Sequence, residues 1–172
     1  MQDRNSIRWI TRTGLLLAVA LVVQSLRLAP PYGQLITGSV INAVLILAVS
    51  LVDIWAGVGI GLLTPWIALI TGIMGLPFMV PFIMAANATL ALVYGLLRNK
   101  GRLLAGIAGA FAKYGFFVLT TNFLLQLFGK QLPPPAVAAF GVTQLGTALV
   151  GVLLALIIYD TIAPMLRGGG RG

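Results

Sequence analysis

The chain has 172 residues, of which 59% are hydrophobic and only 8% are charged, and its mean hydropathy is +1.04. Soluble domains carry about 25% charged residues, so this composition predicts an integral membrane protein without a separate soluble domain. The net charge is +8, and the absence of cysteine and histidine excludes disulfides, thiolate chemistry and the commonest metal ligand and general base. We therefore expect no enzymatic activity, no metal site and no cofactor.

Six apolar segments follow one another along the chain. They are separated by APPYGQ (29–34), a tight turn at Asp53, GLPFMVP (75–81), RNKGR (98–102) and GKQLPPP (129–135). An α-helix needs roughly 20 apolar residues to cross a bilayer. The pattern thus predicts an all-α integral membrane protein, a single transmembrane domain over 1–172 that forms a bundle of six transmembrane helices. The predicted spans are 14–29, 37–52, 54–72, 79–97, 103–128 and 137–163.

The basic residues predict the orientation of this bundle, because lysine and arginine are retained on the cytoplasmic side of a membrane. With a cytoplasmic N-terminus, eight basic residues fall on the inner side, against Arg27 and Lys130 at the outer edge. We expect a multi-pass protein of the cell membrane with both termini cytoplasmic, and no nucleic acid partner. A cleaved signal peptide is the alternative, but no A-x-A pattern follows the first apolar stretch. The inner set is Arg4, Arg8, Arg12, Arg98, Lys100, Arg102, Arg167 and Arg171.

In this orientation the polar residues of the spans gather in the outer half of the membrane. A lone asparagine such as Asn42 commonly just hydrogen-bonds a neighbouring helix. A one-sided set favours a water-accessible cavity open to the outside, since unpaired amides in hydrocarbon cost several kcal/mol each. The candidate substrate-binding residues from this set are Arg27, Asn42, Asn87, Asn122, Gln126 and Gln144.

Lys113 lies about ten residues into the fifth span, near the middle of the membrane. No aspartate or glutamate lies at that depth, so an anionic ligand group is a candidate partner for its charge. Snorkelling of the long side chain to the surface is the alternative. Trp66 offers an apolar wall for the same pocket. Lys113 and Asn122 are nine residues apart and face opposite sides of an ideal helix, so only a long or bent helix would bring both to one site.

Small residues recur at three- and four-residue spacing and allow helices to approach closely. Gly14 and Ala18 in the first span, with Gly57 and Gly61 in the third, form candidate partner surfaces, although packing within the chain explains them equally well. The spans lack the buried carboxylates that ion-coupled carriers generally use, and no phosphate-binding loop for ATP is present. These absences favour a binding subunit that other subunits energise.

The chain resembles the substrate-binding S components of energy-coupling-factor (ECF) vitamin transporters of prokaryotes. The resemblance rests on the six-span plan with a basic N-terminus and on QLITGSVINAVL, GLLTPWIALITG and PFIMAANATLALVYGLL. It implies a subunit of an ABC importer that binds a small vitamin-like molecule from outside and works with a transmembrane coupling subunit and two ATPases. It also implies that loops 28–36, 73–80 and 129–136 gate the pocket. The first helix departs from the family's alanine pattern at Val22, and the N-terminal histidine of nickel and cobalt members is missing.

Other functional classes fit the sequence less well. A structural or assembly subunit without a ligand explains the glycine stripes but not the one-sided amides. An intramembrane enzyme needs a catalytic constellation that the spans lack. A channel needs polar residues through both halves of the membrane. The sequence therefore favours a binding subunit, whose ligand is expected to be anionic because of Lys113 and Arg27.

Overall fold

The computed structural model describes residues 2–28, 32–127 and 129–168, and these residues form helices and turns with no β-strand. Five of the helical stretches are long and apolar enough to cross a membrane, and α3 is a shorter apolar helix. The prediction of an all-α, multi-pass architecture is confirmed at this level. The elements are α1 (Gln2–Ser25), α2 (Tyr32–Leu51), α3 (Ile54–Ile70), η1 (Pro77–Met79), α4 (Val80–Leu97), η2 (Arg98–Lys100), α5 (Arg102–Leu119), η3 (Thr120–Leu124), α6 (Leu125–Leu127), α7 (Pro134–Phe140) and α8 (Val142–Gly168).

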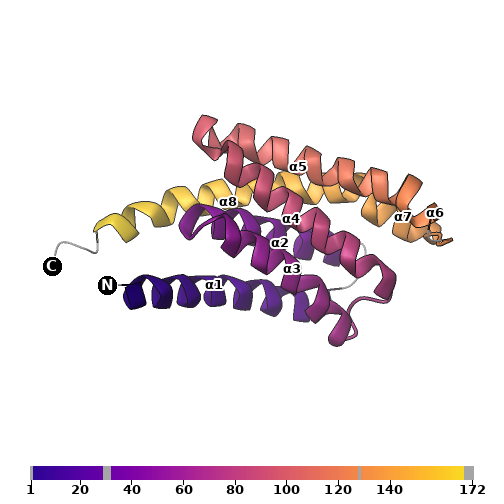
Figure 1. Ribbon diagram of the computed structural model, residues 1–172, viewed down its shortest axis with the longest axis horizontal. Coiled ribbons are helices and arrows are strands. Elements are labelled where there is room, and N and C mark those ends of the chain that lie inside the picture. Colours follow the sequence, from indigo (N-terminus) through magenta and orange to yellow (C-terminus); the bar gives the residue numbers. More distant parts are fainter. Residues whose placement is uncertain (1, 29–31, 128, 169–172) are drawn as a thin grey trace.

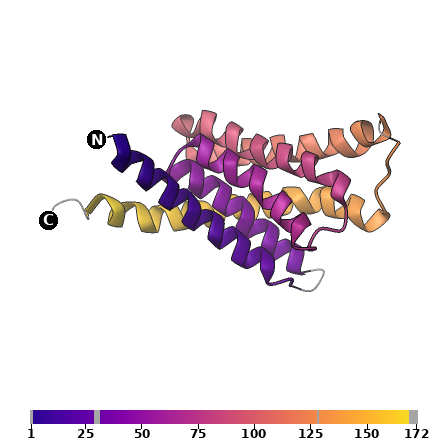
Figure 2. The same cartoon turned by 60° about the horizontal axis from the view of Figure 1, so that its bottom comes forward.

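The helices run roughly along one axis, and the start of α1 and the end of α8 lie at the same end of the bundle (Figures 1 and 2). The turns between α2 and α3 and between α4 and α5 share this end, which we call the termini end. The end of α1, the loop after α3 and the segment 129–133 before α7 lie at the opposite end. We call it the cavity end, because a cavity lined by Leu28, Ile73 and Ala136 lies there. The chain runs along the bundle an even number of times, so it returns to the end at which it began. The passes are α1, α2, α3, α4, α5 with its extension, and α8.

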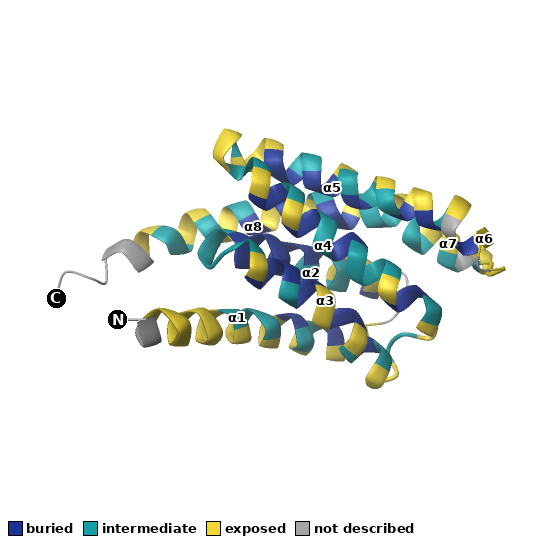
Figure 3. Ribbon diagram, in the orientation of Figure 1, coloured by how far each residue is buried: buried dark blue, intermediate teal, exposed yellow. Residues whose placement is uncertain are grey.

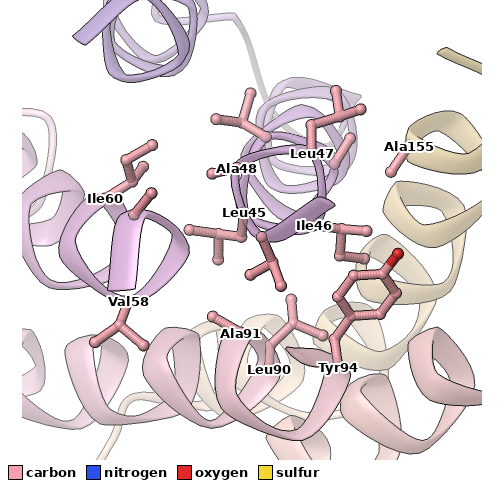
Figure 4. Close-up of a cluster of buried hydrophobic side chains, with 14 of the residues drawn as sticks. Leu45, Ile46, Leu47, Ala48, Val58, Ile60, Leu90, Ala91, Tyr94 and Ala155 are labelled. Atoms are coloured by element: carbon pink, nitrogen blue, oxygen red, sulfur yellow. The ribbon is translucent and has the colours of Figure 1, made fainter. Parts of the chain in front are cut away.

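Helix α2 forms the centre of the bundle and contacts α1, α3, α4 and α8. Its residues 42–49 are buried without interruption, as expected of a helix that is apolar on every side. Figure 4 shows Leu45 and Ile46 of α2 among Leu90 and Tyr94 of α4, with Ile60 of α3 close by. This cluster is the main core.

Outside the core, exposed residues occur on most helices (Figure 3), and many of them carry large apolar side chains. Such a surface is typical of a protein whose solvent is lipid rather than water. Of the five long apolar helices, α1 is the least covered, with only 6% of its apolar stretch buried. It packs on α2 and α3 along one side and leaves the other side open.

The helix boundaries depart from the predicted spans mainly near the starts of α1, α2 and α8. Helix α1 begins at Gln2 rather than at residue 14, because the polar N-terminal residues continue the helix beyond its apolar part. Helix α2 begins at Tyr32 rather than at residue 37. The fifth span agrees with the prediction and includes the π-helical turn η3 and α6. The last span is preceded by a separate short helix, α7, which starts at a proline run. Residues 29 and 128, the predicted ends of two spans, lie outside the described residues.

The turn at Asp53 separates α2 from α3 as predicted, and the structure explains why. The Asp53 side chain accepts a hydrogen bond from the backbone N–H of Ala56 at 2.8 Å, so it caps the start of α3. Its other carboxylate oxygen accepts from Trp9 Nε1 at 2.7 Å. Asp53 therefore ends one helix, begins the next and holds α1 beside them.

Candidate functional site

A cavity of about 530 Å³ lies at the cavity end of the bundle. Its walls come from the ends of α1, α2 and α3, from residues 73–76, and from α4, α7 and α8. All three loops expected to gate a pocket contribute lining residues, including Leu28, Ile73 and Ala136. Aliphatic side chains and Phe140 provide much of the wall. The polar lining residues are Gln24, Arg27, Gln34, Thr37, Thr64, Asn87 and Gln144.

Three polar side chains connect neighbouring helices around this cavity. Gln24 Nε2 donates to the Thr64 carbonyl at 3.3 Å, and Gln34 Nε2 donates to the Ala139 carbonyl at 3.3 Å. The Arg27 guanidinium donates to the Thr71 carbonyl at 2.6 Å. A backbone carbonyl can only accept, so the amide nitrogens must face these partners and each amide oxygen points elsewhere. The wall of the cavity thus has fixed donor and acceptor positions.

A buried polar network lies behind the cavity and centres on Lys113 of α5. Its ammonium donates to Asn42 Oδ1 at 2.6 Å and to Asn87 Oδ1 at 2.8 Å, and only 3% of Lys113 is exposed. An ammonium group can only donate, so it determines how both amides are turned. Asn42 Nδ2 in turn donates to Thr147 Oγ1 at 3.5 Å, and Asn87 Nδ2 donates to the Gly61 carbonyl at 3.3 Å. The network therefore links α2, α3, α4, α5 and α8.

Asn87 is the residue that connects the network to the cavity. It lines the cavity, whereas Lys113 and Asn42 do not. Its oxygen is engaged by Lys113 and one of its two amide hydrogens by Gly61, which leaves the second N–H as a donor. A ligand that reaches the floor of this cavity would meet the remaining N–H of Asn87, whose orientation is fixed by its hydrogen bond with Lys113.

The structure brings five of the eight predicted binding residues to the cavity or to the network behind it. Asn87, Gln144 and Arg27 line the cavity, and Lys113 and Asn42 form the network. The other three predicted residues lie elsewhere.

Asn122, Gln126 and Trp66 are exposed, with Trp66 47% accessible, and none of them lines the cavity. Asn122 donates to the Val118 carbonyl of its own helix at 2.8 Å. The π-helical turn does not rotate Asn122 toward Lys113, so the conflict between their spacing and a shared site remains. Trp66 follows the buried pair Thr64 and Pro65, and it is this pair that lines the cavity.

Gln24, Gln34, Thr37 and Thr64 line the cavity but were not among the predicted site residues. Gln24 lies in the last turn of α1, three residues before the predicted Arg27, so the polar cluster at the end of the first span could also have identified Gln24. Gln34 and Thr37 lie within the QLITGSVINAVL stretch that carried the resemblance. Thr64 has no comparable signal, because a threonine in an apolar helix usually bonds its own backbone, as it does to Ile60 here.

The four small residues of the expected partner surface fall into two groups. Gly14 and Ala18 are exposed on α1, and a Cβ at Gly14 would meet no atom within 4 Å. Gly57 and Gly61 are buried between α2 and α4. A Cβ at Gly57 would lie 2.4 Å from Val49 Cγ2, so close packing inside the bundle accounts for this glycine. We therefore leave Gly57 and Gly61 out of the partner surface.

Comparison of this chain with known protein families, with curated proteins and with solved structures finds no match.

Proposed function

We propose that the protein is the membrane-embedded substrate-binding subunit of an ECF-type importer in a prokaryotic cell membrane. The observation that carries this proposal is the cavity of about 530 Å³, which combines an apolar wall with a few fixed polar groups. Small-molecule sites have about this size and this mixture of walls. A structural or assembly subunit without a ligand is the alternative, but it would have no use for a cavity with oriented amides.

The chemistry of the cavity favours an anionic or acceptor-rich ligand. Arg27 contributes a permanent positive charge at the rim, and Asn87 contributes a donor N–H at depth. The Lys113 side chain lies directly behind Asn87 and orients it. A small vitamin-like molecule with a carboxylate or phosphate would match these groups.

Energy for uptake must come from partners under this proposal. The chain has three acidic residues and no phosphate-binding loop for ATP, so it lacks an ion-coupling site within the spans and an ATPase motif. We propose a transmembrane coupling subunit and two ATPase subunits as partners. The open side of α1, with Gly14 and Ala18 exposed, supports a partner surface there, because small residues let another helix approach closely.

Native mass spectrometry of the purified full chain tests the proposal. We expect a small molecule to remain bound to the parent protein and to be lost from the double variant Arg27→Gln/Asn87→Ala, whose side chains contact the cavity. The matched control is Arg8→Gln/Asn5→Ala, which makes the same chemical changes at exposed residues of α1 that line neither cavity. A parent protein that carries no small molecule and is not stabilised by a panel of vitamins would favour the structural alternative.

We further propose that the termini end is cytoplasmic and the cavity end faces outward. The described basic residues Arg12, Arg98, Lys100 and Arg102 gather at the termini end, which supports this orientation. Single cysteines at positions 100 and 131 are suited to a test in a chain that has no natural cysteine. In intact cells, an impermeant thiol reagent is expected to label position 131 and not position 100. The reverse pattern would contradict the proposed orientation.

A further inference from the structure

A second cavity, of about 330 Å³, lies at the termini end of the bundle, where the last turns of α2 and α4 meet η2, the start of α5 and α8. It differs from the first cavity because every residue that lines it carries a polar side chain. The lining residues are Ser50, Tyr94, Arg98, Asn99, Arg102 and Tyr159. We call it the arginine pocket.

Aromatic side chains indicate that the arginine pocket lies at the depth of lipid headgroups. Trp9 Nε1 donates to Asp53 Oδ2 at 2.7 Å, and Trp55 is 70% exposed beside the same turn. Tryptophan and tyrosine concentrate at the boundary between lipid and water. Ser50 precedes Asp53 by less than one helical turn, so the pocket opens close to this level.

The pocket keeps a positive charge that the chain does not neutralise. Arg102 Nη1 pairs with Asp160 at 2.7 Å, and its guanidinium lies 4.7 Å from the centre of the Tyr159 ring. Arg98 donates to the Val49 carbonyl, and its charge has no carboxylate partner among the described side chains. Arginine matches phosphate oxygens well because its planar group donates several parallel hydrogen bonds.

The start of α5 adds further donors at the edge of this pocket. Helix α5 begins at Arg102, and its cap residue Gly101 provides no side-chain acceptor for the first-turn N–H groups. Free N–H groups at a helix start favour an anion nearby. The hydroxyls of Ser50 and Tyr94, which are 2.8 Å apart, lie in the same pocket.

We propose that the arginine pocket binds a phosphate group, and that the phosphate of an anionic membrane lipid occupies it. Arg98 and Arg102 contact the phosphate oxygens, and the lipid tails follow the exposed apolar surface of the neighbouring helices. Basic pockets between membrane helices on the cytoplasmic side are suited to such headgroups. The site is separate from the cavity at the other end and does not depend on what that cavity binds.

Native mass spectrometry of the delipidated full chain, with phosphatidylglycerol and phosphatidylcholine added in equal amounts, tests this proposal. The parent protein is expected to retain one phosphatidylglycerol in preference to phosphatidylcholine. Arg98→Gln and Arg102→Gln are each expected to lower that retention about tenfold, as for loss of a charge-assisted contact. Lys100→Gln removes the same charge from an exposed neighbour that does not line the pocket, and it is expected to leave retention unchanged.

Asp160→Asn distinguishes the effect of losing the ion pair from the effect of losing the contact between arginine and lipid. It breaks the same pair as Arg102→Gln but leaves the arginine free, so it is expected to retain the lipid at least as well as the parent. If Arg98→Gln does not yield folded protein because its bond to Val49 is lost, Arg102→Gln and Asp160→Asn still provide the comparison. Equal retention by the parent and both arginine variants, or equal loss in Lys100→Gln, would overturn the proposal.

A thermal melt with added inorganic phosphate distinguishes the two sources of the phosphate group. Stabilisation of the parent by phosphatidylglycerol alone identifies the lipid as the occupant. Stabilisation by inorganic phosphate, absent in Arg98→Gln and Arg102→Gln, keeps the phosphate site but assigns it to a soluble anion. A parent protein that responds to neither probe has no phosphate site in this pocket.

Discussion

Replacement of Lys113 by methionine is expected to weaken ligand binding about tenfold or more, although Lys113 does not line the cavity. The ammonium of Lys113 holds Asn87 Oδ1 at 2.8 Å and thereby directs the remaining N–H of that amide. Methionine keeps most of the volume of the side chain but leaves the buried oxygens of Asn42 and Asn87 without this donor. Loss of an oriented hydrogen bond costs about 1–3 kcal/mol, and 1.4 kcal/mol corresponds to one decade in affinity.

A double-mutant cycle tests whether Lys113 acts through Asn87. Affinity for the molecule found by native mass spectrometry is measured calorimetrically in the parent, Lys113→Met, Asn87→Ala and the double variant, after thermal melts confirm folding. If Lys113 positions Asn87, the lysine substitution adds little in the Asn87→Ala background. Additive effects would mean that the lysine charge acts on the ligand directly. Lys100→Met is the matched control, and parent-like binding by Lys113→Met would refute the positioning role.

Replacement of Gly151 by alanine is expected to destabilise the bundle strongly, because this glycine lies against the backbone of α2. A Cβ at this position of α8 would lie 2.6 Å from Asn42 Cβ, 2.8 Å from the Ser39 carbonyl oxygen and 3.0 Å from the Ala43 nitrogen. Two of these atoms belong to the backbone of α2, so no side-chain rotation can relieve the contact. The two helices must separate, and overpacking of this kind costs about 1–3 kcal/mol or more.

Gly146→Ala provides a control on the same helix. A Cβ there would meet nothing within 4 Å, so the substitution is expected to leave stability unchanged or raise it by up to about 1 kcal/mol through helix propensity. Thermal unfolding of both variants in the same detergent provides the comparison. Equal melting temperatures for Gly151→Ala and Gly146→Ala would show that α8 does not pack on α2 as closely as described.

The helical architecture could be predicted from the sequence because its signals are long and local. Apolar runs of membrane length and breaks such as RNKGR located most helices without any knowledge of packing. The start of α1 was placed too late in the chain, because hydrophobicity locates the apolar part of a helix and not its polar first turns. The separate helix α7 was missed for a related reason, since a proline run indicates a break but not the short helix that follows it.

The candidate site could be predicted only in part. Depth along the helices correctly indicated that Asn87 and Gln144 lie toward one end, and the lone charge of Lys113 indicated an interior position. The sequence does not determine how each helix is rotated about its axis in a bundle whose surface is as apolar as its core. For that reason Trp66 and Thr64, two residues apart on α3, could not be assigned to the outer surface and the cavity in advance.

The central position of α2 also determines the order in which the bundle can be completed during synthesis. Helix α2 enters the membrane early, yet α8, with which it makes its most extensive contacts, is synthesised after all the other helices. Asn42 cannot form its side-chain hydrogen bonds until Lys113 has been synthesised, and then Thr147, which is 105 residues away along the chain. Until α8 is in place, the buried Asn42 side chain lacks its hydrogen bond to Thr147. The nascent chain therefore passes through a stage at which the side of α2 that later contacts α8 is still uncovered.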